Sequence, residues 1–164
     1  MSIPLITIIG KSGCGKTTLM EKLVVELKSH SYKLATVKHH SHRGFDIDQP
    51  GKDSWRFARA GSDHVVIASP DKIATYRKVE RELSLDEIAA GILDVDLILV
   101  EGYRQAEKPS LEVIRAANSR EIIGSIAQRF AVAADFPLDL GVPQFGLDDV
   151  QAIAGFIENR FITM

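Results

Sequence analysis

The start of the chain shows two hydrophobic patterns in succession. Residues 3–9 (IPLITII) form a short apolar run rich in β-branched side chains, which predicts a strand buried on both faces. After Thr17 the apolar residues recur every three or four positions with charged residues between them, as on an amphipathic helix. The segment is therefore predicted to fold as a strand, a glycine-rich loop and a helix with a buried face of Leu19, Met20, Leu23, Val24 and Leu27.

The middle of the chain predicts a second strand, a polar loop and a hairpin. The strand covers residues 33–39, and a short helix follows the loop at residues 54–60. Two β-rich runs, HVVIAS and KIATYRKV, then flank Pro70-Asp71, a pair that suits a tight turn. We expect this hairpin to extend the sheet as antiparallel edge strands and to offer an exposed edge for pairing with another subunit.

The rest of the chain returns to alternating helices and strands. Ser84 and Glu87 have the spacing of a capping box, which predicts a helix over residues 84–93. Asp148 can begin a last amphipathic helix. Apolar runs between these helices predict further strands at residues 97–100, 110–115 and 130–134.

This order of elements predicts an α/β fold. Continuous apolar strands that alternate with helices indicate a mainly parallel sheet with helices on both faces, to which the hairpin is an antiparallel extension. No repeat, low-complexity tract or linker interrupts the chain, so residues 1–164 are predicted to form a single domain. Ligands of such sheets bind beyond the carboxyl ends of the strands.

Composition narrows the classes of partner. The chain is 45% hydrophobic and 26% charged with a formal net charge of -2, so no basic excess favours nucleic acid. A single cysteine excludes an internal disulfide and a cysteine zinc site. No signal peptide or long apolar span is present, and we therefore expect a cytoplasmic protein without a membrane partner.

The glycine-rich loop carries the strongest chemical signal. Residues 10–17 (GKSGCGKT) match G-x-x-x-x-G-K-[ST] in full, between a predicted strand and a predicted helix, as in P-loop nucleotide-binding domains. In such a loop the backbone N–H groups point at phosphate oxygens, Lys16 reaches the β and γ phosphates and serves catalysis, and the Thr17 hydroxyl binds Mg²⁺. We assign nucleotide binding to Gly10, Lys11, Ser12, Gly13, Cys14, Gly15, Lys16, Thr17 and Thr18.

Two residues of the loop leave alternatives open. Lys11 stands where a subset of dimeric P-loop proteins carries an extra lysine that reaches phosphate across the dimer interface, and the alternative is a solvated surface lysine. Cys14 is either a small residue that fits a tight loop, which we favour, or a reactive thiol at a helix N-terminus.

A P-loop site also needs a carboxylate at the end of another strand to hold the Mg²⁺ ion and its water. Glu101 follows the apolar run LILV and is the candidate for this metal-binding and catalytic role. Three aspartates of the long polar loop compete for a further metal contact, with turn formation and helix capping as the alternatives. Of Asp46, Asp48 and Asp53 we favour Asp48.

The base and any second substrate are less clearly indicated. No N-K-x-D stretch is present, so Asp135, just after the run AVAA, is the candidate acceptor for a guanine edge. His39, His40 and His42 lie too close together and without cysteines to suit a zinc site, and we expect polar contacts with a ligand or partner, or a solvated loop. With Arg43 they could hold an anionic phosphate group of a ligand.

Several motifs together resemble one family. GKSGCGKTTL, VKHHSH, FDIDQPGKDS followed by AGS, LILVEGY, EVIR and the closing DDVQAIAGFIE are similar to the MobB family of molybdopterin-guanine dinucleotide biosynthesis adaptor proteins, nearly end to end. The resemblance implies a homodimer that binds GTP with Mg²⁺, hydrolyses it weakly, associates with the molybdenum cofactor guanylyltransferase and assists attachment of GMP to molybdopterin. It also implies that residues 13–18 bind phosphate, that the DIDQPGKDS loop is a switch or substrate-facing segment and that Glu101 lies on the metal side.

Other interpretations of the same motifs remain. A small-molecule kinase or ligase that uses ATP or GTP would share the phosphate loop, although no arginine-rich lid is recognisable. A scaffold whose nucleotide only stabilises a dimer is a third possibility. The resemblance does not assign Arg104 or Arg115, for which a surface charge is the alternative.

Overall fold

The computed structural model describes residues 3–40 and 44–163. The chain forms two compact units, a larger unit of residues 1–39 and 85–164 and a smaller unit of residues 40–84. Since the prediction of a single domain is not tested by this division, it stays a prediction. His42 and Arg43, two candidate ligand contacts, lie outside the described residues.

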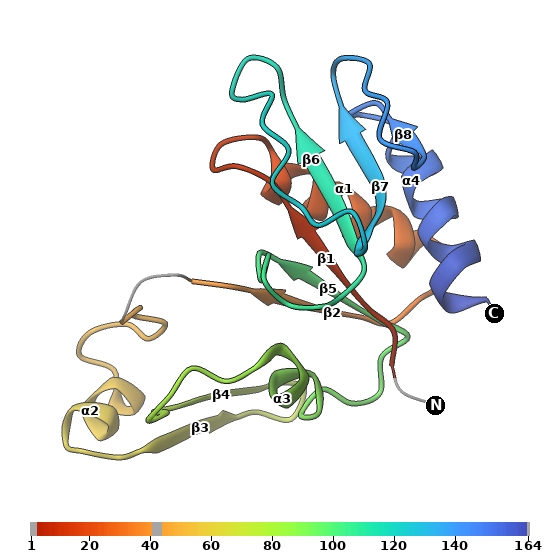
Figure 1. Ribbon diagram of the computed structural model, residues 1–164. Helices are drawn as coiled ribbons and strands as arrows, with labels where there is room; N and C mark the ends of the chain where they lie inside the picture. Colours follow the sequence, from red (N-terminus) through yellow and green to blue (C-terminus); the bar gives the residue numbers. More distant parts are fainter. Residues whose placement is uncertain (1–2, 41–43, 164) are drawn as a thin grey trace. The chain divides into compact units, whose positions relative to one another are not determined.

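A six-stranded parallel sheet forms the centre of the larger unit, with the strand order β2-β5-β1-β6-β7-β8 (Figure 1). Four of the strands correspond to the apolar runs of the sequence, and their inner positions are buried on both faces. Strand β8 was not predicted, because two residues are too few to show a pattern. The strands are β1 (Leu5–Ile9), β2 (Leu34–Lys38), β5 (Leu97–Glu101), β6 (Ser110–Ile114), β7 (Arg129–Ala134) and β8 (Gln144–Phe145).

Helices cover both faces of this sheet, as the sequence predicts. Helices α1 (Lys16–Ser29) and α4 (Val150–Ile157) pack on one face, and Leu23 and Ile153 are fully or almost fully buried there. Helix α3 (Leu85–Ala89) places Leu85 on the other face. It is shorter than the predicted helix 84–93, since the segment that follows contains a glycine and turns back toward β5.

A buried ion pair lies on the second face, where loops rather than a long helix cover the sheet. Glu112 and Arg129 are 2.7 Å apart, with side chains that are 0% and 2% exposed. The Glu112 carboxylate also accepts hydrogen bonds from the backbone N–H groups of Ile123 and Gly124, and Arg129 donates to the Gly124 carbonyl. All the buried charge is therefore hydrogen-bonded, which fixes the loop before β7 onto the sheet.

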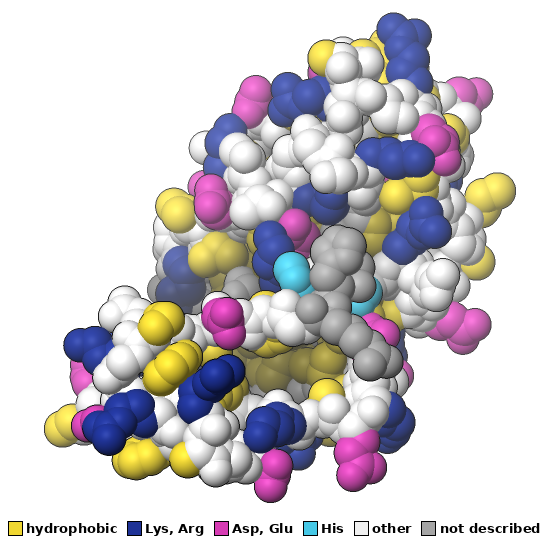
Figure 2. All heavy atoms as spheres, turned by 90° about the vertical axis from the view of Figure 1, so that its left-hand side faces the viewer, with side chains coloured by type: hydrophobic (Ala, Val, Ile, Leu, Met, Phe, Trp, Pro, Cys, Tyr) yellow, Lys and Arg dark blue, Asp and Glu magenta, His cyan; other side chains and the backbone are white. Residues whose placement is uncertain are grey.

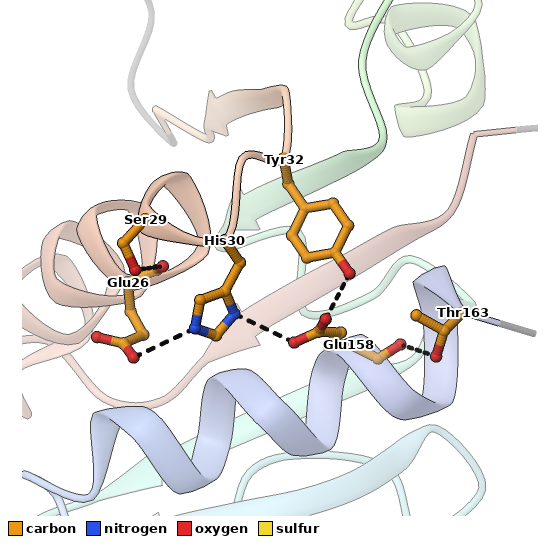
Figure 3. Close-up of polar contacts among 6 residues, drawn as sticks. All are labelled: Glu26, Ser29, His30, Tyr32, Glu158 and Thr163. Carbon is orange, nitrogen blue, oxygen red and sulfur yellow. Dashed lines mark hydrogen bonds and ion pairs between the residues drawn. The ribbon is translucent and has the colours of Figure 1, made fainter.

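The C-terminal end of the chain is tied to the end of α1. The last helical turn, η1 (Glu158–Ile162), continues α4. The Glu158 carboxylate accepts a hydrogen bond from the Tyr32 hydroxyl and lies 3.1 Å from His30 Nδ1, and His30 Nε2 lies 3.6 Å from Glu26 (Figure 3). These contacts hold α4 and η1 against α1.

The smaller unit contains one helix and one hairpin. Helix α2 (Asp53–Arg59) precedes strands β3 (His64–Ala68) and β4 (Ile73–Arg77), which pair antiparallel. The predicted hairpin is confirmed, with Pro70-Asp71 at its turn. The expectation that it extends the larger sheet is wrong in detail, because β3 and β4 form a two-stranded sheet of their own among the described residues.

Candidate functional site

The phosphate loop connects the carboxyl end of β1 to the amino end of α1. Gly10, Gly13 and Gly15 have φ values of 149°, 78° and 101°, which side-chain-bearing residues rarely adopt. A Cβ atom on Gly10 would collide with the Val113 carbonyl and the Cys14 sulfur. The glycines thus let the backbone curl closely over β6, and Gly15 forms the N-cap of a helix of 14 residues.

The side chains of the loop have distinct surroundings. Lys16 Nζ donates to the carbonyls of Gly10 and Lys11 at 3.0 and 2.8 Å, so the ammonium group is held over the loop. Cys14 is 1% exposed, and its burial supports the interpretation as a small residue that fills the loop. Ser12, Gly13, Thr17 and Thr18 are exposed, as a ligand-facing loop requires.

Glu101 lies beside this loop and contacts Thr17. It is the last residue of β5, and its Oε2 accepts a hydrogen bond from Thr17 Oγ1 at 3.0 Å. Lys38, the last residue of β2, lies 3.5 Å from the other oxygen, and the Glu101 side chain is 13% exposed. The three residues meet because β1, β5 and β2 are parallel neighbours whose carboxyl ends share one edge.

This pair of oxygen donors fits Mg²⁺. That ion binds through one or two protein oxygens and takes its other ligands from water and phosphate. Thr17 supplies a hydroxyl and Glu101 a carboxylate within hydrogen-bond distance of each other. Within residues 3–40 and 44–163, His, Cys, Asp and Glu form no group of three that could hold a metal, so the fit is to a hydrated ion and not to a zinc cage.

The other metal candidate, Asp48, belongs to the smaller unit. Its carboxylate accepts hydrogen bonds from the Tyr76 hydroxyl at 2.9 Å and from the Gln49 N–H at 2.8 Å. Hydrogen bonding from Ser54, and then from Tyr76 and Gln49, lowers the pKa of Asp48 against the effect of its burial. The side chain is therefore a carboxylate engaged within its own unit, and its role as a metal ligand stays a prediction.

The histidines have aromatic neighbours. The ring of His39 lies 4.3 Å from the ring of Tyr103, and the ring of His40 lies 5.9 Å from that of Phe45 in an edge arrangement. Both histidines also make further contacts within the structure. Their proposed role toward a ligand is not tested.

Residues 115–121, to which the sequence analysis assigned no role, contact the phosphate loop through three side chains. Arg115 Nε donates to the Cys14 carbonyl at 3.3 Å, and Asn118 Nδ2 donates to the Ser12 carbonyl at 2.7 Å. Lys11 forms an ion pair with Glu121 at 2.7 Å. Lys11 is thus neither free nor simply solvated; it has a partner in its own chain.

Asp135 lies next to this segment. It follows the end of β7, and its Oδ1 accepts a hydrogen bond from the Ala116 N–H at 2.7 Å. Ala116 follows Arg115 in the sequence, and the Arg115 side chain donates to the Cys14 carbonyl of the phosphate loop. Asp135 is therefore linked to the loop indirectly, through this turn. Glu101 thus contacts the loop directly through Thr17, whereas Asp135 contacts Ala116 and its role toward a base stays a prediction.

The position of Arg115 in the sequence offered a signal for this segment. Ligands of parallel sheets contact the residues that directly follow the strands, and Arg115 directly follows β6. Asn118 and Glu121 offered no such signal, because their contacts depend on how the loop folds back.

Comparison with known proteins identifies the family. The sequence pattern of MobB, described as molybdopterin guanine dinucleotide synthesis protein B, matches residues 5–135. The chain belongs to the MobB family. It is 36% identical over 159 residues to a molybdopterin-guanine dinucleotide biosynthesis adapter protein of Haemophilus influenzae, covering 96% of this chain and 89% of that protein.

Two further relatives of the MobB family agree. An adapter protein of the same description from Escherichia coli is 35% identical over 161 residues, or 94% of this chain and 91% of that protein. A crystal structure of molybdopterin-guanine biosynthesis protein B aligns with a TM-score of 0.74 and 33% identity, covering 94% of this chain and 98% of the other. The P-loop fold and the family resemblance predicted from the sequence are thereby confirmed.

Proposed function

We propose that this MobB-family chain is a GTP-binding adapter that assists formation of molybdopterin guanine dinucleotide in the cytoplasm. The observation that carries the proposal is the hydrogen bond between Thr17 and Glu101, which aligns the phosphate loop with a metal-side carboxylate. The names of the relatives from Haemophilus influenzae and Escherichia coli support the adapter role. The described residues contain no helix long and apolar enough to cross a membrane.

In this proposal the backbone N–H groups of the loop and Lys16 hold the phosphates of GTP. Lys16 Nζ already lies over the loop, where it donates hydrogen bonds to the carbonyls of Gly10 and Lys11. When GTP binds, hydrogen bonds to phosphate oxygens would replace these two. Thr17 and Glu101 would hold Mg²⁺, which neutralises charge on the β and γ phosphates when bound. Asp135 would accept from the N–H groups of guanine.

Hydrolysis of GTP at this site is proposed to be slow. It requires a water molecule to attack the γ phosphate while GDP leaves, and a positioned glutamine or an arginine finger accelerates this step in other P-loop proteins. The sequence offers neither in a recognisable motif. Nucleotide binding would then mainly serve as a signal for a partner.

We propose that the chain acts as a homodimer that associates with the molybdenum cofactor guanylyltransferase. The smaller unit supports the dimer, because its two-stranded sheet leaves outer strand edges without a partner strand among the described residues. Large apolar side chains of this unit are 45% to 71% exposed, and Figure 2 shows such side chains in yellow among the dark-blue Lys and Arg. They are Phe45, Ile47, Phe57, Val66, Ile67, Ile73 and Val79.

The adapter role is tested by reconstitution. Purified guanylyltransferase is supplied with molybdopterin and Mg²⁺-GTP, and dinucleotide formation is measured with the wild-type chain or with Lys16→Ala. We expect the wild type to raise the yield or rate and the variant to fail. Equal dinucleotide formation with and without the wild-type chain contradicts the adapter role, and strong stimulation of nucleotide turnover by a small molecule indicates a kinase or ligase instead. Direct binding of molybdopterin is measured separately, with the unliganded chain.

A further inference from the structure

The guanidinium group of Arg115 lies against the phosphate loop at the start of α1. Its Nε donates to the Cys14 carbonyl at 3.3 Å. Its Nη2 lies 3.3 Å from the point where a Cβ atom on Gly15 would be, so the group occupies the space beside the residue that caps the helix. The N–H groups of this turn are the ones that hold phosphate in a P-loop, so the guanidinium lies beside the segment where a phosphate would bind.

We propose that Arg115 is a further nucleotide-contacting residue, which donates hydrogen bonds to the α and β phosphates. The inference rests on the proposed nucleotide site and adds a residue to it. A guanidinium has five N–H donors in a rigid fork that matches phosphate oxygens. Within the described residues, the hydrogen bonds of Arg115 use one of these donors.

Asp148, a carboxylate that interacts with the charge of Arg115, has another direct partner. Asp148 is paired with Lys22, with Oδ1 and Nζ 2.7 Å apart. Lys22 first, through its hydrogen bond and charge, and Arg115 more weakly lower the pKa of Asp148. Since Lys22 is the direct partner of Asp148, the guanidinium of Arg115 remains available to an anion that enters the loop.

The backbone around Arg115 is held in place before any ligand binds. The Arg115 carbonyl accepts from the N–H groups of Asn118 and Ser119, both at 2.9 Å, which closes a turn directly after β6. Asp135 fixes the next residue through the Ala116 N–H, and Asn118 joins the turn to Ser12. Because the backbone at Arg115 is already fixed, little conformational entropy is lost when its side chain contacts a phosphate. This favours a contribution of the contact to nucleotide affinity.

The position of the guanidinium along the loop selects the phosphates. The backbone of a P-loop surrounds the α and β phosphates, whereas the conserved lysine extends to the γ phosphate. Arg115 donates to the Cys14 carbonyl and lies beside Gly15, and Lys16 lies over Gly10 and Lys11. We therefore expect Arg115 to strengthen the binding of GDP and GTP by the same factor.

The test compares Arg115→Gln with the wild type and with Lys28→Gln. Glutamine retains an N–H donor for the Cys14 carbonyl while it removes the charge. Lys28 lies at the other end of α1, about 18 Å away along the helix, and provides a matched loss of one positive charge. GDP and GTP affinities are measured by equilibrium titration at two salt concentrations, together with the melting temperature of each unliganded protein.

We expect Arg115→Gln to weaken GDP and GTP binding about 10- to 100-fold each, to reduce the salt dependence of binding and to leave the unliganded melting temperature unchanged. Lys28→Gln should bind as the wild type does. Unchanged affinity in a folded Arg115→Gln variant, or a loss with the salt dependence of the wild type, overturns the inference. If Arg115→Gln does not fold, Arg115→Lys decides: retained salt dependence with weakened affinity supports a phosphate contact, and wild-type affinity overturns it. A wild-type protein that binds no nucleotide refutes the proposed function itself.

Discussion

The hydroxyl of Thr17 donates a hydrogen bond to Glu101 Oε2 over 3.0 Å, although 84 positions separate the two residues in the sequence. The parallel pairing of β1 with β5 places Ile8 opposite Glu101, so the loop after β1 begins beside this carboxylate. The proposed metal side of the proposed nucleotide site is therefore built by strand register and not by local sequence. A substitution that changes this one contact should therefore weaken the binding of Mg²⁺ while it leaves the binding of the nucleotide itself largely intact.

Glu101→Gln should weaken the effect of Mg²⁺ on nucleotide binding. Glutamine keeps the shape and can still accept from Thr17, but it removes the negative charge that the ion requires. We expect Mg²⁺ to be bound about 10- to 100-fold more weakly, while nucleotide affinity without Mg²⁺ changes little or rises. Titration of the nucleotide-bound protein with Mg²⁺ measures this, with Glu107→Gln at an exposed position as the control. An unchanged Mg²⁺ dependence would refute the metal-side role of Glu101.

Glu121→Gln should increase nucleotide affinity slightly. Lys11 and Glu121 form an ion pair whose side chains are 42% and 61% exposed, so the pair is weak. Its loss leaves Lys11 free for phosphate and removes a negative charge near the loop, and we expect at most about a 5-fold gain for GTP. Lys11→Ala in the same titration should reduce affinity and abolish the effect of Glu121→Gln. An equal effect of Glu121→Gln in both backgrounds would show that the ion pair is irrelevant.

Asp135→Asn should change the choice of base. A carboxylate accepts from both N–H groups at the edge of guanine, whereas an amide presents one acceptor and one donor and suits the carbonyl of xanthine. Loss of one charged hydrogen bond corresponds to about a 10- to 100-fold decrease in GTP affinity, with XTP binding gained. Competition between GTP, XTP and ATP measures the change. Equal weakening for all three nucleotides would mean that Asp135 only supports the turn at Ala116.

Much of the fold follows from the sequence, because the buried strands are continuous apolar runs. The runs around residues 97–100 and 130–134 and the glycine loop between β1 and α1 appear at the predicted places. The phosphate loop was recognisable because its chemistry requires a fixed local spacing, and Glu101 because it ends a buried strand. These features depend on neighbouring residues alone.

The remaining features depend on distant residues. The contacts of Arg115, Asn118 and Glu121 with the loop arise from a turn that folds back after β6, and no periodicity marks such a turn. The hairpin itself was predicted, because its turn and its two strands are local. Whether its strands also pair with the larger sheet depends on tertiary structure, which the local pattern does not show. The buried pair of Glu112 and Arg129 is likewise visible only once β6 and β7 are neighbours.

The tie between α1 and η1 should show in the titration of Tyr32. Its hydrogen bond to Glu158, then burial, and then the charges of Glu158 and Asp96 raise the pKa of Tyr32 above its ordinary value of 10.0. The raised pKa favours the neutral phenol in the folded state. This contribution to stability is complete below pH 10 and is lost as the pH rises through the folded-state pKa.

Glu158→Gln should lower the pKa of Tyr32 toward 10.0. It should reduce the stability of the chain below pH 10 and make the loss of stability at alkaline pH smaller. Ultraviolet absorbance titration of the tyrosines measures the change, and the variant Tyr32→Phe identifies which part of the curve belongs to this residue. A titration curve in Glu158→Gln identical to that of the wild type would contradict the proposed cause of the shift.

The most direct test of the central claim is an equilibrium titration of the wild type and Lys16→Ala with GTP and ATP, each with and without Mg²⁺. We expect the wild type to bind GTP more tightly than ATP, and GTP more tightly with Mg²⁺ than without it. Lys16→Ala should remain folded by circular dichroism and lose GTP affinity by at least about 100-fold, because Lys16 is the charged group over the loop. Undiminished GTP affinity in the folded variant would contradict the assignment of residues 10–17 as the phosphate site.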